Sequence, residues 1–213
     1  KIQISCPKCF DEGREKDKGK KVPYVPTYPY WEYPIIELDS WDNYYEFVCE
    51  KGHTNRFFLQ IELFEMLFQQ ATYCINDGYY REAIGTFNTA VERFMEFSIE
   101  MLFTMDNPNG VDFSDFWKLI KHQSERQIGA FYLLWSKHFK RKPLILENQQ
   151  VIKDGRKSKN YKELRNEVIH QGHIASKEEA TAFGKITFDY LKEHKQIIFK
   201  AIEDEGFLPG IRY

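Results

Sequence analysis

The sequence has few cysteines, no long apolar run and almost no net charge, and each shortage excludes a class of protein. Four cysteines in 213 residues are too few for a fold held by disulfide bonds. No apolar stretch approaches the roughly 20 residues that span a bilayer, and no charged-then-apolar leader opens the chain. We therefore expect a soluble, cytoplasmic protein with no membrane partner. A net charge of −2 argues against a protein that is basic throughout.

The composition that remains is that of a globular protein. Apolar residues make up 42% of the chain and charged residues 29%, which excludes a disordered chain. The length suits one ordinary domain, or a small module followed by a medium one with its own core. No internal repeat is evident.

Three cysteines and one histidine form two pairs. Cys6 and Cys9 stand in C-P-K-C, and Cys49 and His53 stand in C-E-K-G-H. Thiolate and imidazole suit zinc, which takes four ligands in a tetrahedron, and Gly52 tolerates the backbone of a tight turn. We predict that these four side chains hold a structural Zn²⁺. Reduced thiols without a metal are one alternative, and a redox pair is another, although no βαβ pattern surrounds C-P-K-C.

The chain around the two pairs favours a small β module, a zinc ribbon over residues 1–58. Residues 11–21 are polar and charged, and residues 23–34 hold four prolines, so we expect loop and irregular chain there. Short strands are predicted over residues 35–39, 44–49 and 55–60. Nine aromatic residues lie within residues 24–47. We expect them to cover the ribbon or dock it, with stacking on nucleic-acid bases as the alternative.

Residues 59–213 predict a helical domain, because apolar side chains recur there at helical spacing. The expected helices cover about residues 61–78, 80–106, 113–121, 124–139, 161–170 and 176–205. Ser124-x-x-Gln127 and Ser176-x-x-Glu179 fit capping boxes at the start of two of them. The pattern over residues 142–159 is ambiguous and predicts a polar loop at its end. The predicted fold class is therefore mainly α, a helical bundle preceded by the small β module.

Positive charge is concentrated in residues 137–165, which hold ten Lys or Arg against three acids. An excess of seven positive charges on a mildly acidic protein indicates a local contact with a polyanion such as RNA. Lys157, Lys159 and Lys162 are the candidates for contacts with an RNA backbone. A solvated lysine-rich loop is the alternative.

The basic segment runs into Arg165-Asn166-Glu167-Val168-Ile169-His170. An arginine, a polar residue directly after it and a histidine after a spacer of four, on a short helix late in a helical domain, resemble the signature of the HEPN superfamily. The order of elements over residues 61–207 is also similar to that family. Glu92, on the second long helix, resembles an acid often present there.

The resemblance implies a metal-independent endoribonuclease with Arg165, Asn166 and His170 as catalytic residues in a composite site of a homodimer. It also implies a toxin or phage-defence effector, and an antitoxin or regulatory partner is then expected. The residue types fit this chemistry, because RNA carries its own nucleophile, the 2′-OH. Histidine can transfer the protons, arginine can hold the phosphate and asparagine can orient either group.

Helix geometry leaves the site of one chain incomplete. Asn166 and His170 share a helix face, whereas Arg165 and His170 are about 140° apart around the axis. The alternative is structural: Arg165 forms an intramolecular salt bridge, and His170 interacts with the helix dipole. Two other functions therefore stay open, a non-catalytic HEPN-like module that binds nucleic acid or a ligand, and a zinc-ribbon nucleic-acid adaptor.

Overall fold

The computed structural model describes residues 2–3, 6, 8–9, 35–36, 44–58, 61–107, 110–154 and 157–204. The chain divides into two compact units, which we call the N-terminal unit (residues 1–62) and the helical unit (residues 63–213). The predicted polar loop at 11–21 and proline-rich stretch at 23–34 lie outside the described residues.

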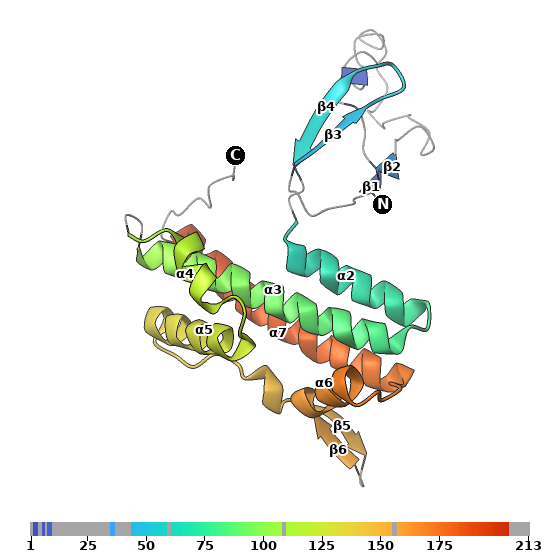
Figure 1. Cartoon of the computed structure of the whole chain (residues 1–213), viewed down its shortest axis with the longest axis vertical. Helices are drawn as coiled ribbons and strands as arrows, with labels where there is room; N and C mark the ends of the chain where they lie inside the picture. The colour runs from blue at the N-terminus through green and yellow to red at the C-terminus, as the bar shows by residue number, and fades with distance from the viewer. Residues whose placement is uncertain are drawn as a thin grey trace, which may run out of the picture. The chain divides into compact units, whose positions relative to one another are not determined.

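The N-terminal unit contains two small antiparallel sheets (Figure 1). The first pairs β1 (Ile2–Gln3) with β2 (Ile35–Ile36), and the second pairs β3 (Tyr44–Val48) with β4 (Thr54–Phe58). In the second sheet the register aligns Val48 with Thr54, so the hairpin closes through residues 49–53. The first two predicted strands therefore contain β2 and β3, the third overlaps β4 over residues 55–58, and β1 is additional.

The helical unit is built from six described helices and one short hairpin, which makes the described fold mainly helical, as predicted. Its elements are α2 (Leu63–Asn76), α3 (Tyr80–Asp106), α4 (Phe113–Ile120), α5 (Ser124–Phe139), the 3-10 turn η2 (Leu146–Asn148), β5 (Gln150–Asp154), β6 (Lys157–Asn160), α6 (Tyr161–His170) and α7 (Lys177–Asp204). In the part of the chain that is described, no helix is both long and apolar enough to cross a bilayer.

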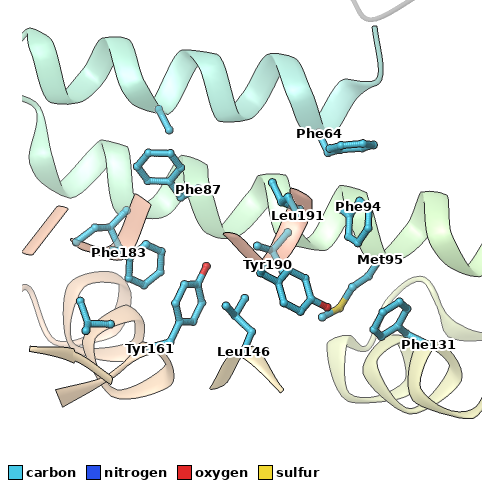
Figure 2. Close-up of a cluster of buried hydrophobic side chains, with 14 of the residues drawn as sticks. Phe64, Phe87, Phe94, Met95, Phe131, Leu146, Tyr161, Phe183, Tyr190 and Leu191 are labelled. Atoms are coloured by element: carbon cyan, nitrogen blue, oxygen red, sulfur yellow. The ribbon is translucent and has the colours of Figure 1, made fainter. Parts of the chain in front are cut away.

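The long helix α3 lies at the centre of the helical unit and packs against α2, α5, α6 and α7 (Figure 1). Its apolar stripe includes Phe87 and Phe94, which meet Phe183 and Tyr190 of α7 in one buried cluster (Figure 2). A Cβ atom added to Gly184 of α7 would lie 2.6 Å from Cζ of Phe87. A glycine is therefore what lets α7 approach the ring on α3 so closely.

Two of the helix starts test the predicted capping boxes. At α7, the Ser176 N–H donates to Glu179 Oε2 at 2.8 Å and the Glu179 N–H donates to Ser176 Oγ at 3.1 Å, which confirms the second box. The first is wrong, because α5 starts at Ser124 without a side-chain cap, and buried Gln127 donates to the carbonyl oxygen of Lys121 instead.

The segment predicted to end in a polar loop forms the β5–β6 hairpin, with Asp154 opposite Lys157. The hairpin lies beside α6, at the end of the bundle away from α4 (Figure 1). Asn160, the last residue of β6, caps α6 through a capping box with Glu163 that the sequence analysis did not identify. The basic segment therefore leads into the motif helix directly from a β-strand.

Candidate functional site

Four side chains of the N-terminal unit converge at one point. The candidate ligand atoms of Cys6, Cys9, Cys49 and His53 all lie within 4.8 Å of one another. The turn that carries the last two is closed by hydrogen bonds from Gly52 N–H to the Cys49 carbonyl oxygen (2.8 Å) and from Cys49 N–H to the His53 carbonyl oxygen (3.1 Å). Gly52 has φ +80°, the backbone region that favours glycine.

Three of the distances among these atoms are close to the edges of a tetrahedral metal site. Zinc–sulfur bonds of about 2.3 Å and zinc–nitrogen bonds of about 2.0 Å give tetrahedron edges of about 3.8 Å for S···S and about 3.5 Å for S···N. In the structure, Cys9 Sγ lies 3.6 Å from Cys49 Sγ, and His53 Nδ1 lies 3.4 Å from Cys9 Sγ and 3.7 Å from Cys6 Sγ. The cluster can hold a metal ion and is compatible with zinc.

The thiols of this cluster influence one another's ionisation. Burial opposes ionisation of Cys6, but hydrogen bonds from the Cys9 backbone N–H and from His53 outweigh it and lower the pKa of Cys6 to about 6. Burial together with the neighbouring Cys49 and Cys6 raises the pKa of Cys9 to about 12. Adjacent thiolates repel each other, and a bound cation compensates that repulsion.

The second candidate group lies on α6 of the helical unit. Its buried side consists of Tyr161, Leu164 and Val168, which pack into the core. The helix ends at His170, two residues before Gly172, which has φ +71°. Asn166 and His170 lie on the side away from the buried residues.

The structure brings Arg165 and Asn166 together with two residues of α3. The Arg165 Nη1 atom donates to Asn166 Oδ1 at 2.9 Å, and Arg165 Nη2 lies 3.7 Å from Glu92 Oε1. Asn88 donates to the same Glu92 oxygen at 2.9 Å and so fixes the carboxylate. The Arg165 side chain is 28% exposed, and its buried Nε has no hydrogen-bond partner among the described residues.

His170 stands apart from this group. It is the last residue of α6 and is exposed, and within the described ranges its side chain has no hydrogen bond or ion pair. The structure therefore joins Arg165 to Asn166 but leaves the imidazole of His170 to solvent. Within one chain, the side chains of Arg165 and His170 therefore do not meet at a common point.

The three candidate RNA-binding lysines differ in their surroundings. Lys159 is only 19% exposed and forms ion pairs with Glu167 and, at 3.9 Å, with Glu179. Lys162 is exposed on α6. The side chain of Lys157 lies outside the described side chains. Of the three, Lys162 is the described side chain that is open to a phosphate.

A further pair lies just beyond the motif. His173 Nε2 is 3.1 Å from both carboxylate oxygens of Glu179, although the sequence analysis gave neither residue this role. The pair joins the turn after α6 to the first turn of α7. A local pattern does not reveal it, because Glu179 also fits an ordinary helix cap.

Comparisons with protein-family models, with curated proteins and with solved structures found no match for this chain. The case for a function therefore rests on the residues described above.

Proposed function

We propose that the protein is a metal-independent endoribonuclease of the HEPN type whose N-terminal unit is a zinc ribbon. The observation that carries the proposal is the grouping on α6: Arg165 held by Asn166 and Glu92, with the exposed His170 on the same helix. A partly exposed arginine that neighbouring polar groups hold in place is suited to a phosphate.

The proposed reaction uses the nucleophile of the RNA itself. The 2′-oxygen attacks the adjacent phosphorus while a base takes its proton, and the leaving 5′-oxygen receives a proton from an acid. Arg165 stabilises the additional negative charge on the phosphorane, and Asn166 keeps the guanidinium oriented. His170 transfers one of the two protons, because imidazole titrates near neutral pH.

A homodimer completes this site in our proposal. His170 lies about 140° around the helix from Arg165, so a single α6 cannot direct both at one phosphate from the same face. Two copies facing each other supply two arginines and two histidines around one groove. Lys162, exposed on the same helix, is placed to contact the RNA backbone beside that groove.

The zinc proposed for Cys6, Cys9, Cys49 and His53 has a structural role. Four protein ligands fill its tetrahedron and leave no position for water or substrate, which is typical of structural sites. The ribbon is then a scaffold or a module that grips RNA. We further propose a cytoplasmic toxin or phage-defence effector, restrained by an antitoxin or another regulatory protein.

A non-catalytic module that binds RNA or another ligand is the second candidate function. The ion pairs of Lys159 and the contact between Arg165 and Glu92 favour it, because engaged side chains stabilise a fold without any chemistry. A position at the end of a helix also suits His170 as a partner of the helix dipole. In this candidate, the zinc ribbon serves as a nucleic-acid adaptor.

Cleavage of total RNA by the full-length protein separates the two functions. We expect the wild type to cut RNA during a brief incubation with excess chelator, and we expect His170→Ala and Arg165→Ala to lose at least about 100-fold in rate. His122→Ala, which removes another exposed histidine, is the matched control and keeps full activity. An RNA substituted throughout with 2′-deoxy sugars resists cleavage. Equal rates for the wild type and His170→Ala would overturn the proposal.

A further inference from the structure

The pair formed by His173 and Glu179 has the geometry of a histidine oriented by a carboxylate. His173 Nε2 lies 3.1 Å from Oε1 and 3.1 Å from Oε2 of Glu179, and the carboxylate is only 14% exposed. The imidazole is 30% exposed, so a substrate can reach part of the ring. Sites that transfer protons commonly hold one nitrogen of a histidine in this way and use the other.

Glu179 is fixed in place by the backbone of α7. The Ser176 N–H donates to its Oε2 at 2.8 Å, and its own N–H donates back to Ser176 Oγ at 3.1 Å. Burial raises the pKa of the Glu179 carboxyl, but hydrogen bonds from Ser176 and His173 and the charge of Lys159 outweigh it, so the net pKa is lowered. The ionised carboxylate only accepts hydrogen bonds, so Nε2 of His173 carries a proton and Nδ1 holds the free lone pair.

The charged groups around this pair come from each element beside it. Lys159 of β6 bridges Glu179 and Glu167, and Glu167 lies on α6, one turn before His170. The Glu167 carbonyl oxygen accepts from the backbone N–H of Gln171 (3.0 Å) and of His173 (3.1 Å). From α3, Arg81 donates to the Val168 carbonyl oxygen at 3.4 Å. These contacts fix the turn that carries His173 relative to the helix that carries His170.

We propose that His173, oriented by Glu179, is the general base of the reaction for which His170 is the acid. This inference rests on the proposed ribonuclease function. His173 Nδ1 takes the proton of the 2′-OH as the bond from the 2′-oxygen to phosphorus forms. The bond from phosphorus to the 5′-oxygen then breaks, and the His170 imidazolium gives its proton to that oxygen. The two imidazoles exchange protonation states, and Glu179 stabilises the imidazolium formed on His173.

The chain offers a matched pair of variants for the test. Glu179→Gln keeps the capping box, since glutamine also serves at that position, but removes the charge behind His173. Glu163→Gln makes the same change in the capping box of α6, where the carboxylate accepts from the Asn160 N–H and has no histidine partner among the described residues. Any loss of activity specific to Glu179→Gln therefore reports on the carboxylate and not on a weakened helix start.

The experiment measures the rate of RNA cleavage against pH for the full chain. We expect Glu179→Gln to lose about tenfold or more in rate and the acidic side of its pH–rate profile to change, because the imidazolium that forms on His173 during the reaction loses a stabilising charge. His173→Asn loses at least about 100-fold. Glu163→Gln keeps the wild-type rate and pH profile. The NMR signal of the His173 Nε2–H proton moves in Glu179→Gln and stays in place in Glu163→Gln.

The outcomes separate this inference from the function on which it rests. If the wild type cuts RNA and His170→Ala does not, while Glu179→Gln and His173→Asn keep the wild-type rate and pH profile, the general base lies elsewhere and the proposed function stands. If the wild type does not cut RNA, both are wrong. An unchanged NMR signal of the His173 Nε2–H proton in Glu179→Gln overturns the pairing itself.

Discussion

The two compact units are stabilised by different means. In the helical unit, one continuous cluster of buried apolar side chains joins α2, α3, α5, α6 and α7. In the described part of the N-terminal unit, the buried side chains are Cys6, Cys49 and Asn55, and two of these are candidate metal ligands. A module this small buries too little apolar surface to offset the entropy of its chain, so a metal ion is expected to supply the difference.

The largest expected effect comes from removing one ligand. Cys49→Ser removes one ligand of the proposed zinc site, and structural zinc contributes about 10–16 kcal/mol to the folding of a small module. We expect loss of bound zinc and of the NMR signals of β3 and β4, while the circular dichroism of the helices persists. Retention of the metal in Cys49→Ser would show that the ligand set is different.

Cys74→Ser is the matched control for this change. Cys74 is a half-buried thiol on α2 of the helical unit and is not part of the cluster. It is expected to keep one zinc per chain. If Cys49→Ser also unfolded the helices, the two units would not be stabilised separately.

The second effect is confined to the helical unit. A Cβ at Gly184 would lie 2.6 Å from the Phe87 ring, so Gly184→Ala forces α3 and α7 apart and is expected to cost about 1–3 kcal/mol. The free energy of unfolding, followed by circular dichroism in urea, measures this cost. The zinc content is expected to stay the same.

The matched control is expected to change the stability of the helical unit in the opposite direction. Gly129 on α5 has nothing within 4 Å of an added Cβ, so Gly129→Ala gains helix propensity without a clash. We expect it to stabilise the helices by about 0.5–1 kcal/mol. If both substitutions stabilised the helices, the close approach at Gly184 would be disproved.

Local patterns in the sequence were sufficient for the parts of the fold that depend on nearby residues. The apolar spacing located α6, and Ser176 with Glu179 located the start of α7, because both signals act within one or two helical turns. Ser124 with Gln127 failed as a cap, because tertiary packing directs the Gln127 amide to a carbonyl in the preceding turn. The β5–β6 hairpin, in which Asp154 pairs with Lys157, was not predicted, because the pattern over residues 142–159 is ambiguous.

Among contacts between distant residues, one was also predicted from the sequence and others were not. The spacing of C-P-K-C and C-E-K-G-H predicted the cysteine and histidine cluster across a long gap, because zinc coordination restricts the residue types and their spacing. Glu92 and Arg165 were each singled out, but their contact depends on how α6 packs on α3. The contact between Glu179 and His173 also depends on tertiary packing. A metal ion restricts the types and spacing of its ligands, but nothing comparable in the sequence identifies the partner of a charged side chain.

The smallest expected effect is a pH dependence of the helical unit. His194 on α7 is buried, donates from Nδ1 to the Tyr190 carbonyl oxygen at 2.9 Å, and has no partner for Nε2 among the described residues. Burial lowers its pKa below the ordinary value of 6.5. The neutral form is therefore favoured in the folded state, and its contribution to stability is complete above pH 6.5 and is lost as the pH falls below that value.

Urea unfolding between pH 8 and pH 5 tests this expectation. The free energy of unfolding of the wild type should fall by up to about 1.4 kcal/mol per pH unit below pH 6.5. His194→Leu should show little of this pH dependence. His122→Gln, an exposed histidine, keeps it. Release of zinc on acidification should follow the same curve in all three proteins, because protonation of its own ligands governs it. A wild-type slope that persists in His194→Leu would assign the acid sensitivity of the helices to another group.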